Sequence, residues 1–439
     1  MTNRIPEMVL AIDFSLDRLD VSLRGDDREW LWAHQAYANN WLGWQQLKQD
    51  LLFELEQAIP VRLAVAGEST GPYWWHAFYH FSHNDDLRPF SPKLALCNPA
   101  HVKNYRKALP EQDKTDPDDT RLIDRFYRAA NIKHPYQFHD RYLHLRTFTR
   151  AYRRVTQSLA SEKAYLLSII YLWASDYQHK EEKPFSNLFG VTGQYILNEF
   201  ADIQAVADIP LAELTALLVR CSGNSFTDPQ SNARKLHDVA RNSYPIPAHL
   251  ATALHRVIQH TLAHIRFLSD NQKAYRQLIQ QELDTLPEAQ LALDFKGLGP
   301  ILVAGCLSEI QNTARFVTGT KFDRRLKLNR PRTYRDGQAS VAKLAGLWWP
   351  RHDSGRAQGS QPFLARERNP HLRYWFVQAA HTLQRYQPDY RRFYWKKYHE
   401  AHKHHHKRAI VLTARKAVRL IFALLHKGRQ ACLEEGVLT

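Results

Sequence analysis

The chain has 439 residues, of which 44% are hydrophobic, enough for the cores of two or three domains. Its 60 Lys and Arg outnumber its 44 Asp and Glu, and the net charge of +16 points to a polyanionic partner rather than merely a basic soluble protein. The sequence shows no membrane-length apolar run, no signal-type N-terminus and only four scattered cysteines, so we expect a prokaryotic-type cytosolic protein without membrane contact, zinc ribbon or disulfides.

The first 130 or so residues alternate between strand-like and helix-like patterns. Strands are predicted at residues 8–13, 19–23, 61–66 and 93–97, and helices at 41–58, 72–81 and from 116 onward. The order β-β-α-β-α-β-α predicts an α/β domain in which helices cover the faces of a sheet.

Four acidic residues stand at ends of these predicted elements. Asp13 and Glu68 each close an apolar strand-like run. Asp116 is suited to begin a helix because it can cap the backbone N–H groups and Pro117 fits the first turn. Asp119 lies three residues later and therefore on the same helix face as Asp116.

Carboxylates grouped in this way predict a site for Mg²⁺ or Mn²⁺. Two such ions ~4 Å apart, held by shared carboxylates, position a phosphate for displacement. The alternative is that Asp13 and Glu68 are ordinary strand-end residues and Asp116 a plain helix cap. Each residue alone fits that alternative better, but the four together, in so basic a chain, favour a metal site for phosphodiester chemistry.

The middle of the chain, from 141 to 290, has a charged helical pattern that is interrupted near 221–247. Long paired helices here would either connect domains or form a dimerising coiled coil, and the heptads do not choose between them. Gly297 and Gly299 then precede a predicted helix at 301–310. Such a turn exposes backbone N–H groups to a phosphate, although an ordinary interhelix turn fits as well.

The C-terminal part combines cationic and aromatic residues. Residues 319–366 have a basic, loop-like pattern and residues 371–432 a helical one. The stretch 391–398 interleaves Arg and Lys with Phe, Tyr and Trp, which suits phosphate contact with base stacking. The histidine-rich run at 403–408 indicates an exposed helix contacting nucleic acid rather than a metal site.

Several short motifs together resemble the DEDD-type transposases of insertion sequences related to the Piv invertase. They lie at residues 11–15, 68–73, 98–99, 114–119, 296–300, 309–310, 315–316, 345–347, 353–355 and 368–373. Their order along nearly the whole chain argues against chance agreement. Two departures are Thr120, where the family has alanine, and extra material in the middle and C-terminal parts.

The resemblance implies a RuvC/RNase H-like α/β domain at 1–140, a helical, coiled-coil-like region at 141–290 and a mainly α transposase domain at 291–439. It places the family's acids on Asp13, Glu68, Asp116 and Asp119, and its serine nucleophile on Ser354. Members are understood as bridge-RNA-guided recombinases. The implied partners are therefore donor and target DNA, a guide RNA and further copies of the chain, as a dimer assembling to a tetramer.

The neighbours of Ser354 suit a nucleophile, because they offer cations, a base and a flexible backbone. Without the resemblance, a solvated turn would be the better interpretation of this stretch. Further nucleic-acid contacts are predicted at Lys114, Gly297, Gly299, Arg351, Arg356 and Arg373. Two rival functions stay open: a RuvC-like metal nuclease that hydrolyses DNA junctions with water, and a non-catalytic nucleic-acid-binding relative.

Overall fold

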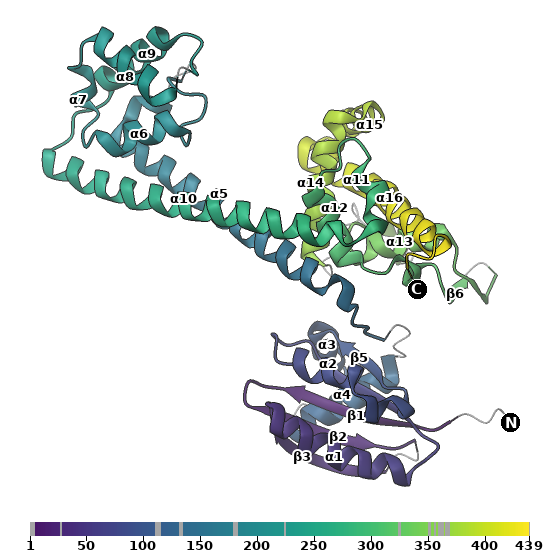
Figure 1. Cartoon of the computed structure of the whole chain (residues 1–439). Helices are drawn as coiled ribbons and strands as arrows, with labels where there is room; N and C mark the ends of the chain where they lie inside the picture. The colour runs from purple at the N-terminus through teal and green to yellow at the C-terminus, as the bar shows by residue number, and fades with distance from the viewer. Residues whose placement is uncertain are drawn as a thin grey trace. The chain divides into compact units, whose positions relative to one another are not determined.

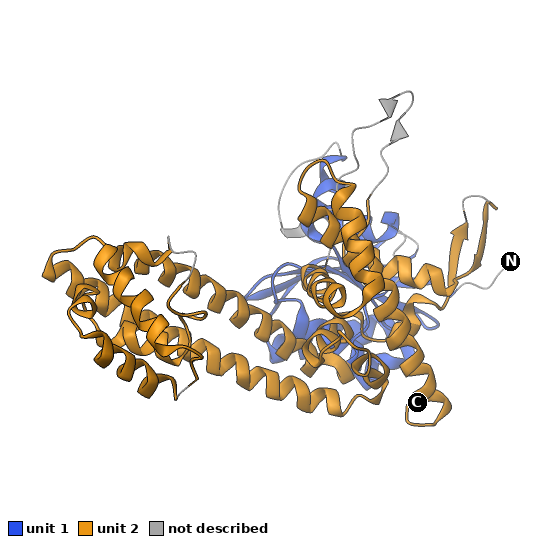
Figure 2. Cartoon of the chain, turned by 90° about the horizontal axis from the view of Figure 1, so that it is seen from above, with its two compact units in different colours: residues 1–139 blue, residues 140–439 orange. Residues whose placement is uncertain are grey.

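The computed structural model describes residues 5–26, 29–109, 116–130, 135–178, 183–223, 225–323, 326–349, 353–354, 357–358, 364 and 369–438. At 116–117, 353–354 and 357–358 only the backbone is described. The chain divides into two compact units, residues 1–139 and 140–439 (Figure 1, Figure 2). Within the described ranges, no helix is long and apolar enough to cross a membrane.

Unit 1 is built on a five-stranded mixed sheet with the order β3-β2-β1-β4-β5. The strands are β1 (Glu7–Phe14), β2 (Arg18–Arg24), β3 (Trp30–Ala38), β4 (Arg62–Glu68) and β5 (Lys93–Cys97). The first three form an antiparallel meander, while β4 and β5 run parallel to β1. Parallel neighbours require crossover connections, which here contain α1 (Trp41–Gln57) and α2 (Trp75–His83).

This arrangement confirms the predicted α/β character of the N-terminal part but adds β3, which the sequence pattern missed. Only Trp32 and Tyr37 are buried in β3, and they are five residues apart. Register shifts opposite Val21–Leu23 disturb the pairing of β3 with β2. An irregular edge strand of this kind carries no period-two pattern that the sequence could display.

The two faces of the sheet are covered by different helices. On one face the large side chains of β1 and β2 pack against α1 and α2. The other face is lined mainly by alanines of β1, β4 and β5, and it contacts Ile123 and Tyr127 of α4 (Asp116–Ala130). Small side chains let α4 lie close to the strands. A further helix, α3 (Pro99–Lys107), packs against α4.

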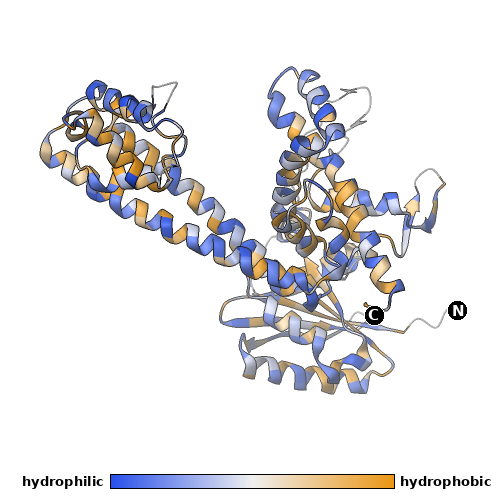
Figure 3. Ribbon diagram, turned by 45° about the horizontal axis from the view of Figure 1, so that its top comes forward, coloured by the Kyte–Doolittle hydropathy of each residue, from blue (hydrophilic) through white to orange (hydrophobic). Residues whose placement is uncertain are grey.

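Unit 2 is helical apart from two short hairpins, as expected for the rest of the chain. Its longest helices, α5 (Leu143–Trp173) and α10 (Ala248–Asp284), pack side by side (Figure 1). Between them the chain forms a small bundle with its own apolar core, in which the hydrophobic positions gather (Figure 3). The bundle consists of α6 (Val191–Glu199), α7 (Gln204–Ala207), α8 (Leu211–Ser222) and α9 (Pro229–Asn242).

A second core joins the far ends of α5 and α10 to the C-terminal helices. These are α11 (Gln290–Leu293), α12 (Pro300–Ile310), α13 (Tyr334–Leu344), α14 (Pro370–Tyr386), α15 (Pro388–His399) and α16 (His405–Glu434). The hairpins are β6 (Thr320–Asp323) with β7 (Leu328–Pro331), and β8 (Asp353–Ser354) with β9 (Ala357–Gln358). The loop-like pattern over 319–366 therefore concealed α13. The division of this unit into separate middle and C-terminal domains stays a prediction.

Candidate functional site

Two carboxylates lie at the ends of neighbouring parallel strands. Ile12 of β1 is in register with Gly67 of β4, so the residues that follow them, Asp13 and Glu68, lie side by side. Side chains alternate along a strand, which places both carboxylates on the face that α4 covers. A Cβ on Gly67 would lie 2.3 Å from the ring of Phe14, so glycine at this position makes room for the Phe14 ring on the opposite face of the sheet.

A third carboxylate comes from the first turns of α4. Asp119 precedes Ile123 by one helical turn, and Ile123 packs on the alanine-lined face of the sheet. Arg106 of α3 donates a hydrogen bond to Asp119 and forms an ion pair with it. The backbone of Asp116 starts α4, while its side chain lies outside the described residues.

The electrostatics of Glu68 show that Asp13, Glu68 and Asp119, here called the acidic cluster, lie close together. Burial raises the pKa of Glu68, and the charges of Asp13 and Asp119 raise it further, to about 7, against the opposing effects of Arg106 and a hydrogen bond from Thr70. Arg106 thus offsets part of the repulsion between Glu68 and its acidic neighbours.

An oxygen-only donor set with excess negative charge fits a hard divalent cation such as Mg²⁺ or Mn²⁺. Among the side chains that the structure describes, no three or more His, Cys, Asp or Glu are grouped as a metal-binding set. The side chain of Asp116, the fourth predicted ligand, is not among those described. The acidic cluster fits a metal by its charge and donor type, while its three described side chains alone do not form a metal-binding set.

A fourth acidic residue of α4, Asp124, has a different environment. Its side chain is fully buried, and its oxygens accept hydrogen bonds from Arg24 at 2.9 Å and Arg128 at 2.8 Å. Two arginines neutralise this carboxylate, so it joins α4 to β2 as a structural ion pair.

Unit 2 contains a buried carboxylate surrounded by cations. Glu309 at the end of α12 accepts hydrogen bonds from Arg150 at 2.7 and 3.0 Å and from Asn369 at 2.7 Å, and Arg146 lies 3.6 Å away. Burial acts to raise the pKa of Glu309, but the hydrogen bond from Arg150 and the charges of Arg146 and Arg150 outweigh it and lower the pKa. Glu309 is therefore ionised, and Arg146 and Arg150 of α5 neutralise it.

Asn369 connects this carboxylate to residues 345–368, here called the serine segment because it contains Ser354. The side chain of Asn369 caps the first turn of α14, and its backbone N–H donates to the carbonyl of Leu344 at 2.8 Å. Gly346, with φ of +65°, turns the chain away from the end of α13. The two ends of the serine segment are thus joined beside Glu309.

Burial and the arginine cluster, defined as Arg146, Arg150 and Arg153 of α5, together determine the charge of His371. Burial lowers the pKa of His371, and Arg150, Arg153 and Arg146 lower it further, to about 4, against the effect of Glu309. Arg153 donates to the carbonyl of Pro370 at 2.9 Å. At neutral pH this region has three cations, one carboxylate and a neutral imidazole, which suits an anionic ligand.

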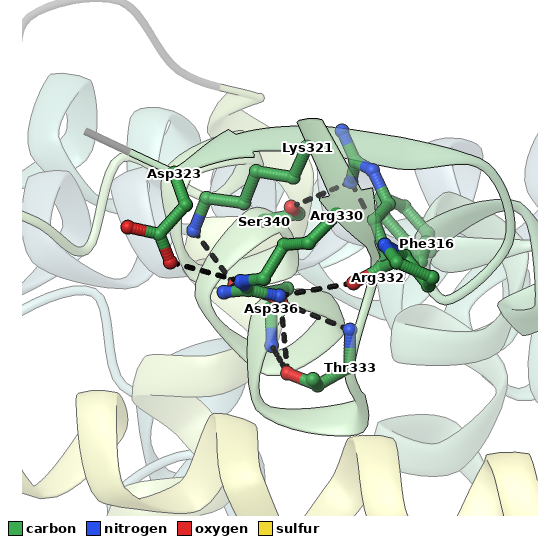
Figure 4. Close-up of polar contacts among 9 residues, drawn as sticks. Phe316, Lys321, Asp323, Arg330, Arg332, Thr333, Asp336 and Ser340 are labelled. Carbon is green, nitrogen blue, oxygen red and sulfur yellow. Dashed lines mark hydrogen bonds and ion pairs between the residues drawn. The ribbon is translucent and has the colours of Figure 1, made fainter. Parts of the chain in front are cut away.

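The start of α13 is fixed by a polar network around Asp336 (Figure 4). Arg330 and Lys321 of the β6–β7 hairpin each donate to Asp336 at 2.7 Å, and Thr333 completes a capping box with it. The hydrogen bond from Arg330, with that from Lys321, holds the pKa of Asp336 well below its usual range although burial opposes it. The network therefore joins the β6–β7 hairpin to the N-terminal end of α13.

The other predicted residues are only partly placed. The backbone of Ser354 lies in β8, but its side chain, Lys114, Arg351 and Arg356 lie outside the described residues. Gly297 has φ of +103°, and Gly299 is an exposed N-cap of α12. Arg373 lies on α14 and is partly buried.

Sequence reasoning missed Arg106, Asn369, His371 and the arginine cluster as neighbours of the predicted site. A signal existed for the arginine cluster, since spacings of four and three residues place Arg146, Arg150 and Arg153 on one face of a helix. No comparable local pattern marks Arg106.

Two protein-family models match the chain, one over the acidic cluster and the other over the serine segment. Residues 10–171 match a model described as a transposase, of the DEDD type of IS110 elements. Residues 326–395 match a model described as the transposase IS116/IS110/IS902 family. The first match includes the acidic cluster and the arginine cluster, and the second includes Ser354 and Asn369. No curated protein matches the chain.

Proposed function

Because this chain belongs to the IS110 family of DEDD transposases, enzymes that cut and recombine DNA, we propose that it joins DNA through a covalent bond to Ser354 with help from the acidic cluster. The observation that carries this proposal is the convergence of Asp13, Glu68 and Asp119 at one end of the sheet, with the pKa of Glu68 at about 7. The mixed sheet with acids at the ends of β1 and β4 supports the proposed RuvC/RNase H-like character of unit 1.

We assign Asp13, Glu68 and Asp119, together with Asp116, as the residues that would hold Mg²⁺ or Mn²⁺. When bound, such a metal neutralises charge that develops on the reacting phosphate. Strand pairing fixes Asp13 relative to Glu68, and Arg106 orients Asp119. These residues would therefore position a phosphodiester without large rearrangement of the sheet.

In the proposed step, the hydroxyl oxygen of Ser354 forms a bond to phosphorus while a bridging P–O bond of the DNA breaks. The departing DNA hydroxyl takes up a proton, and a hydroxyl of another strand later displaces the serine in the reverse reaction. The arginine cluster supports this role, because the serine segment begins and ends beside three cations that suit a phosphate.

The proposed partners are donor and target DNA, a guide RNA and further copies of the chain, as a dimer assembling to a tetramer. The net charge of +16 supports nucleic-acid partners. Exposed apolar residues on the long helices, such as Leu172 of α5 and Phe267 of α10, support contact with another copy.

The experiment that tests the proposal measures recombination in cells that carry the gene with its native flanking DNA and a target plasmid. Wild type is compared with Ser354→Ala and Asp13→Ala, and with the matched controls Ser360→Ala and Asp17→Ala. We expect precise junctions in wild type and both controls, none in the two site variants, and a protein–DNA adduct on denaturing gels that requires Ser354.

Three other results would contradict the proposal. Junctions that survive Ser354→Ala would remove the nucleophile role. Strand cleavage by wild type without any adduct would favour a RuvC-like nuclease that uses water. Nucleic-acid binding without cleavage or junctions would favour a non-catalytic relative.

A further inference from the structure

Unit 2 has a cavity of about 660 Å³ where α5, α10, α12 and α14 meet. This volume lies within the range of pockets that hold small organic molecules. Its lining combines aromatic rings, arginines and the exposed start of α12. The serine chemistry proposed above makes no use of this cavity, so its function has to be sought separately.

The aromatic part of the lining is held rigidly. Trp375 packs flat against Gly305 of α12, where a Cβ would lie 2.2 Å from the indole ring. The ring centroids of Tyr374 and Trp375 are 4.8 Å apart, and those of Tyr152 of α5 and Trp375 are 6.5 Å apart. Arg153 stacks on Tyr374, 4.7 Å from its ring centre. The rings are therefore positioned before any ligand arrives.

The polar part of the lining provides donors for a phosphate and for a base edge. Arg276 and Arg385 are exposed, and Arg276 donates to the hydroxyl of Tyr152 at 3.3 Å. The start of α12 also lines the cavity, but Pro300 has no N–H and the N–H groups of Leu302 and Val303 donate to the carbonyl of Gly299, so the two arginines are the cations for a phosphate. The amide of Gln378 adds both a donor and an acceptor.

We propose that this cavity receives one unpaired nucleotide, with its base against Tyr374 and Tyr152 and its phosphate between Arg276 and Arg385. Rings for stacking together with cations for the backbone are the combination that binds single-stranded nucleic acid. A base pair is too large for this space, so the nucleotide has to be unstacked from its neighbours. The inference rests on the proposed nucleic-acid function and adds the unpaired nucleotide as the species recognised.

The test measures binding of labelled oligothymidylate and of an abasic chain of the same length, at one fixed salt concentration. We expect Tyr374→Ala to weaken oligothymidylate binding about tenfold and to leave abasic binding unchanged, because one stacking contact is lost. Arg385→Gln should weaken both probes equally. Tyr386→Ala, which removes an exposed tyrosine of the same helix outside the cavity lining, should change neither.

Two further measurements identify the nucleic acid that is bound and the residues that contact the base. Oligouridylate in place of oligothymidylate decides whether the nucleotide comes from RNA or DNA. A 5-iodouracil probe should crosslink to Tyr374 or Tyr152 on irradiation, as mapped by mass spectrometry, and Tyr374→Phe should retain base-dependent binding. Equal weakening of both probes by Tyr374→Ala, or crosslinks elsewhere only, would overturn the inference.

These readouts do not involve recombination, so failures of the two proposals are distinguishable. Base-dependent binding that needs Tyr374 in a protein without recombination would reject only the proposed function. Recombination with no effect of Tyr374→Ala on base preference would reject only the nucleotide site.

Discussion

The acidic cluster of unit 1 and the arginine cluster of unit 2 are opposite in charge. In unit 1, burial and the charges of Asp13 and Asp119 raise the pKa of Glu68 to about 7, although Arg106 opposes them. In unit 2, Arg146 and Arg150 form ion pairs with Glu309, whose pKa is lowered. Among the described side chains, carboxylates therefore outnumber cations in the first cluster and arginines outnumber carboxylates in the second.

The acidic cluster and the arginine cluster are suited to bind ligands of opposite charge. A cluster of mutually repelling carboxylates gains stability from a cation, whereas an arginine-rich surface around one satisfied carboxylate gains it from an anion. Phosphoryl transfer needs both, namely a metal site and cations near the nucleophile. Substitutions in the two regions should therefore differ in their effects on metal binding and on stability.

The largest effect is expected from Asp13→Asn. Losing one of the carboxylates proposed to bind the metal should remove several kcal/mol of stabilisation of the reacting phosphate, so cleavage in Mg²⁺ should fall by about 10³-fold. Thermal stability without metal should not fall, because a repelling charge has been removed. Cleavage of a labelled substrate and thermal unfolding measure the two effects, with Asp17→Asn as control. A variant that unfolds would show that Asp13 is structural.

Unlike Asp13→Asn, Arg150→Ala should lower the free energy of unfolding. Removing a partner of the buried Glu309 leaves its charge unpaired, and we expect about 2–3 kcal/mol of destabilisation, reduced because Arg150 is partly exposed. Urea unfolding measures it, with the exposed neighbour Arg154→Ala as control. Adding Glu309→Gln to Arg150→Ala should recover part of the loss. Equal effects of Arg150→Ala and Arg154→Ala would contradict the prediction.

Glu68→Gln should stabilise unit 1 at high pH. The folded pKa of about 7 exceeds the ordinary 4.5, so ionisation of Glu68 costs stability progressively as pH rises from 4.5 to 7 and fully above it. Full linkage corresponds to about 3 kcal/mol, which partial exposure reduces to about 1–2 kcal/mol.

Unfolding measured without divalent ions should therefore favour Glu68→Gln near pH 8 and show little difference near pH 4. Glu56→Gln, at an exposed position of α1, serves as the control. Added Mg²⁺ should stabilise wild type more than Glu68→Gln. A difference that grows toward low pH would show that the sign is wrong.

The smallest effect is expected from Arg106→Gln. Its ion pair with Asp119 is partly exposed and opposes a bound cation, so its removal should raise Mn²⁺ affinity near pH 8 by about two- to fivefold. Calorimetric titration measures this change, with Lys107→Gln as the control. Weaker Mn²⁺ binding by Arg106→Gln would instead show that orienting Asp119 matters more than the repulsion between Arg106 and the bound cation.

Local patterns allowed part of this structure to be predicted. Residues 41–58 and 93–97 were expected as a helix and a strand, and α1 and β5 agree because their apolar spacing is regular. The third strand was missed because only two of its residues are buried, and α13 was missed because it lies within a basic, loop-like stretch although its buried residues recur at helical spacing. Burial against distant elements determines these structures, and local propensity does not reveal it.

Some residues of the candidate site could likewise be predicted from local patterns, and others could not. Carboxylates that follow apolar runs marked Asp13 and Glu68, whereas the distinction between Asp119 and Asp124 on one helix depends on which arginines lie nearby. Arg150 and Glu309 are separated by 159 positions, so their pairing follows from how α5 packs on α12. Residue spacing cannot supply such a contact.

The hydrogen bond between Leu344 and Asn369 has a consequence for how relatives can diverge. Since this contact holds both ends of the serine segment, the helices on either side do not depend on the number of residues between them. Doubling the length of a closed loop costs only about 0.6 kcal/mol. Ala345 and Leu347 are buried in the core of unit 2 and have to be retained, whereas a change in the number of residues between 348 and 368 should leave the helical framework intact.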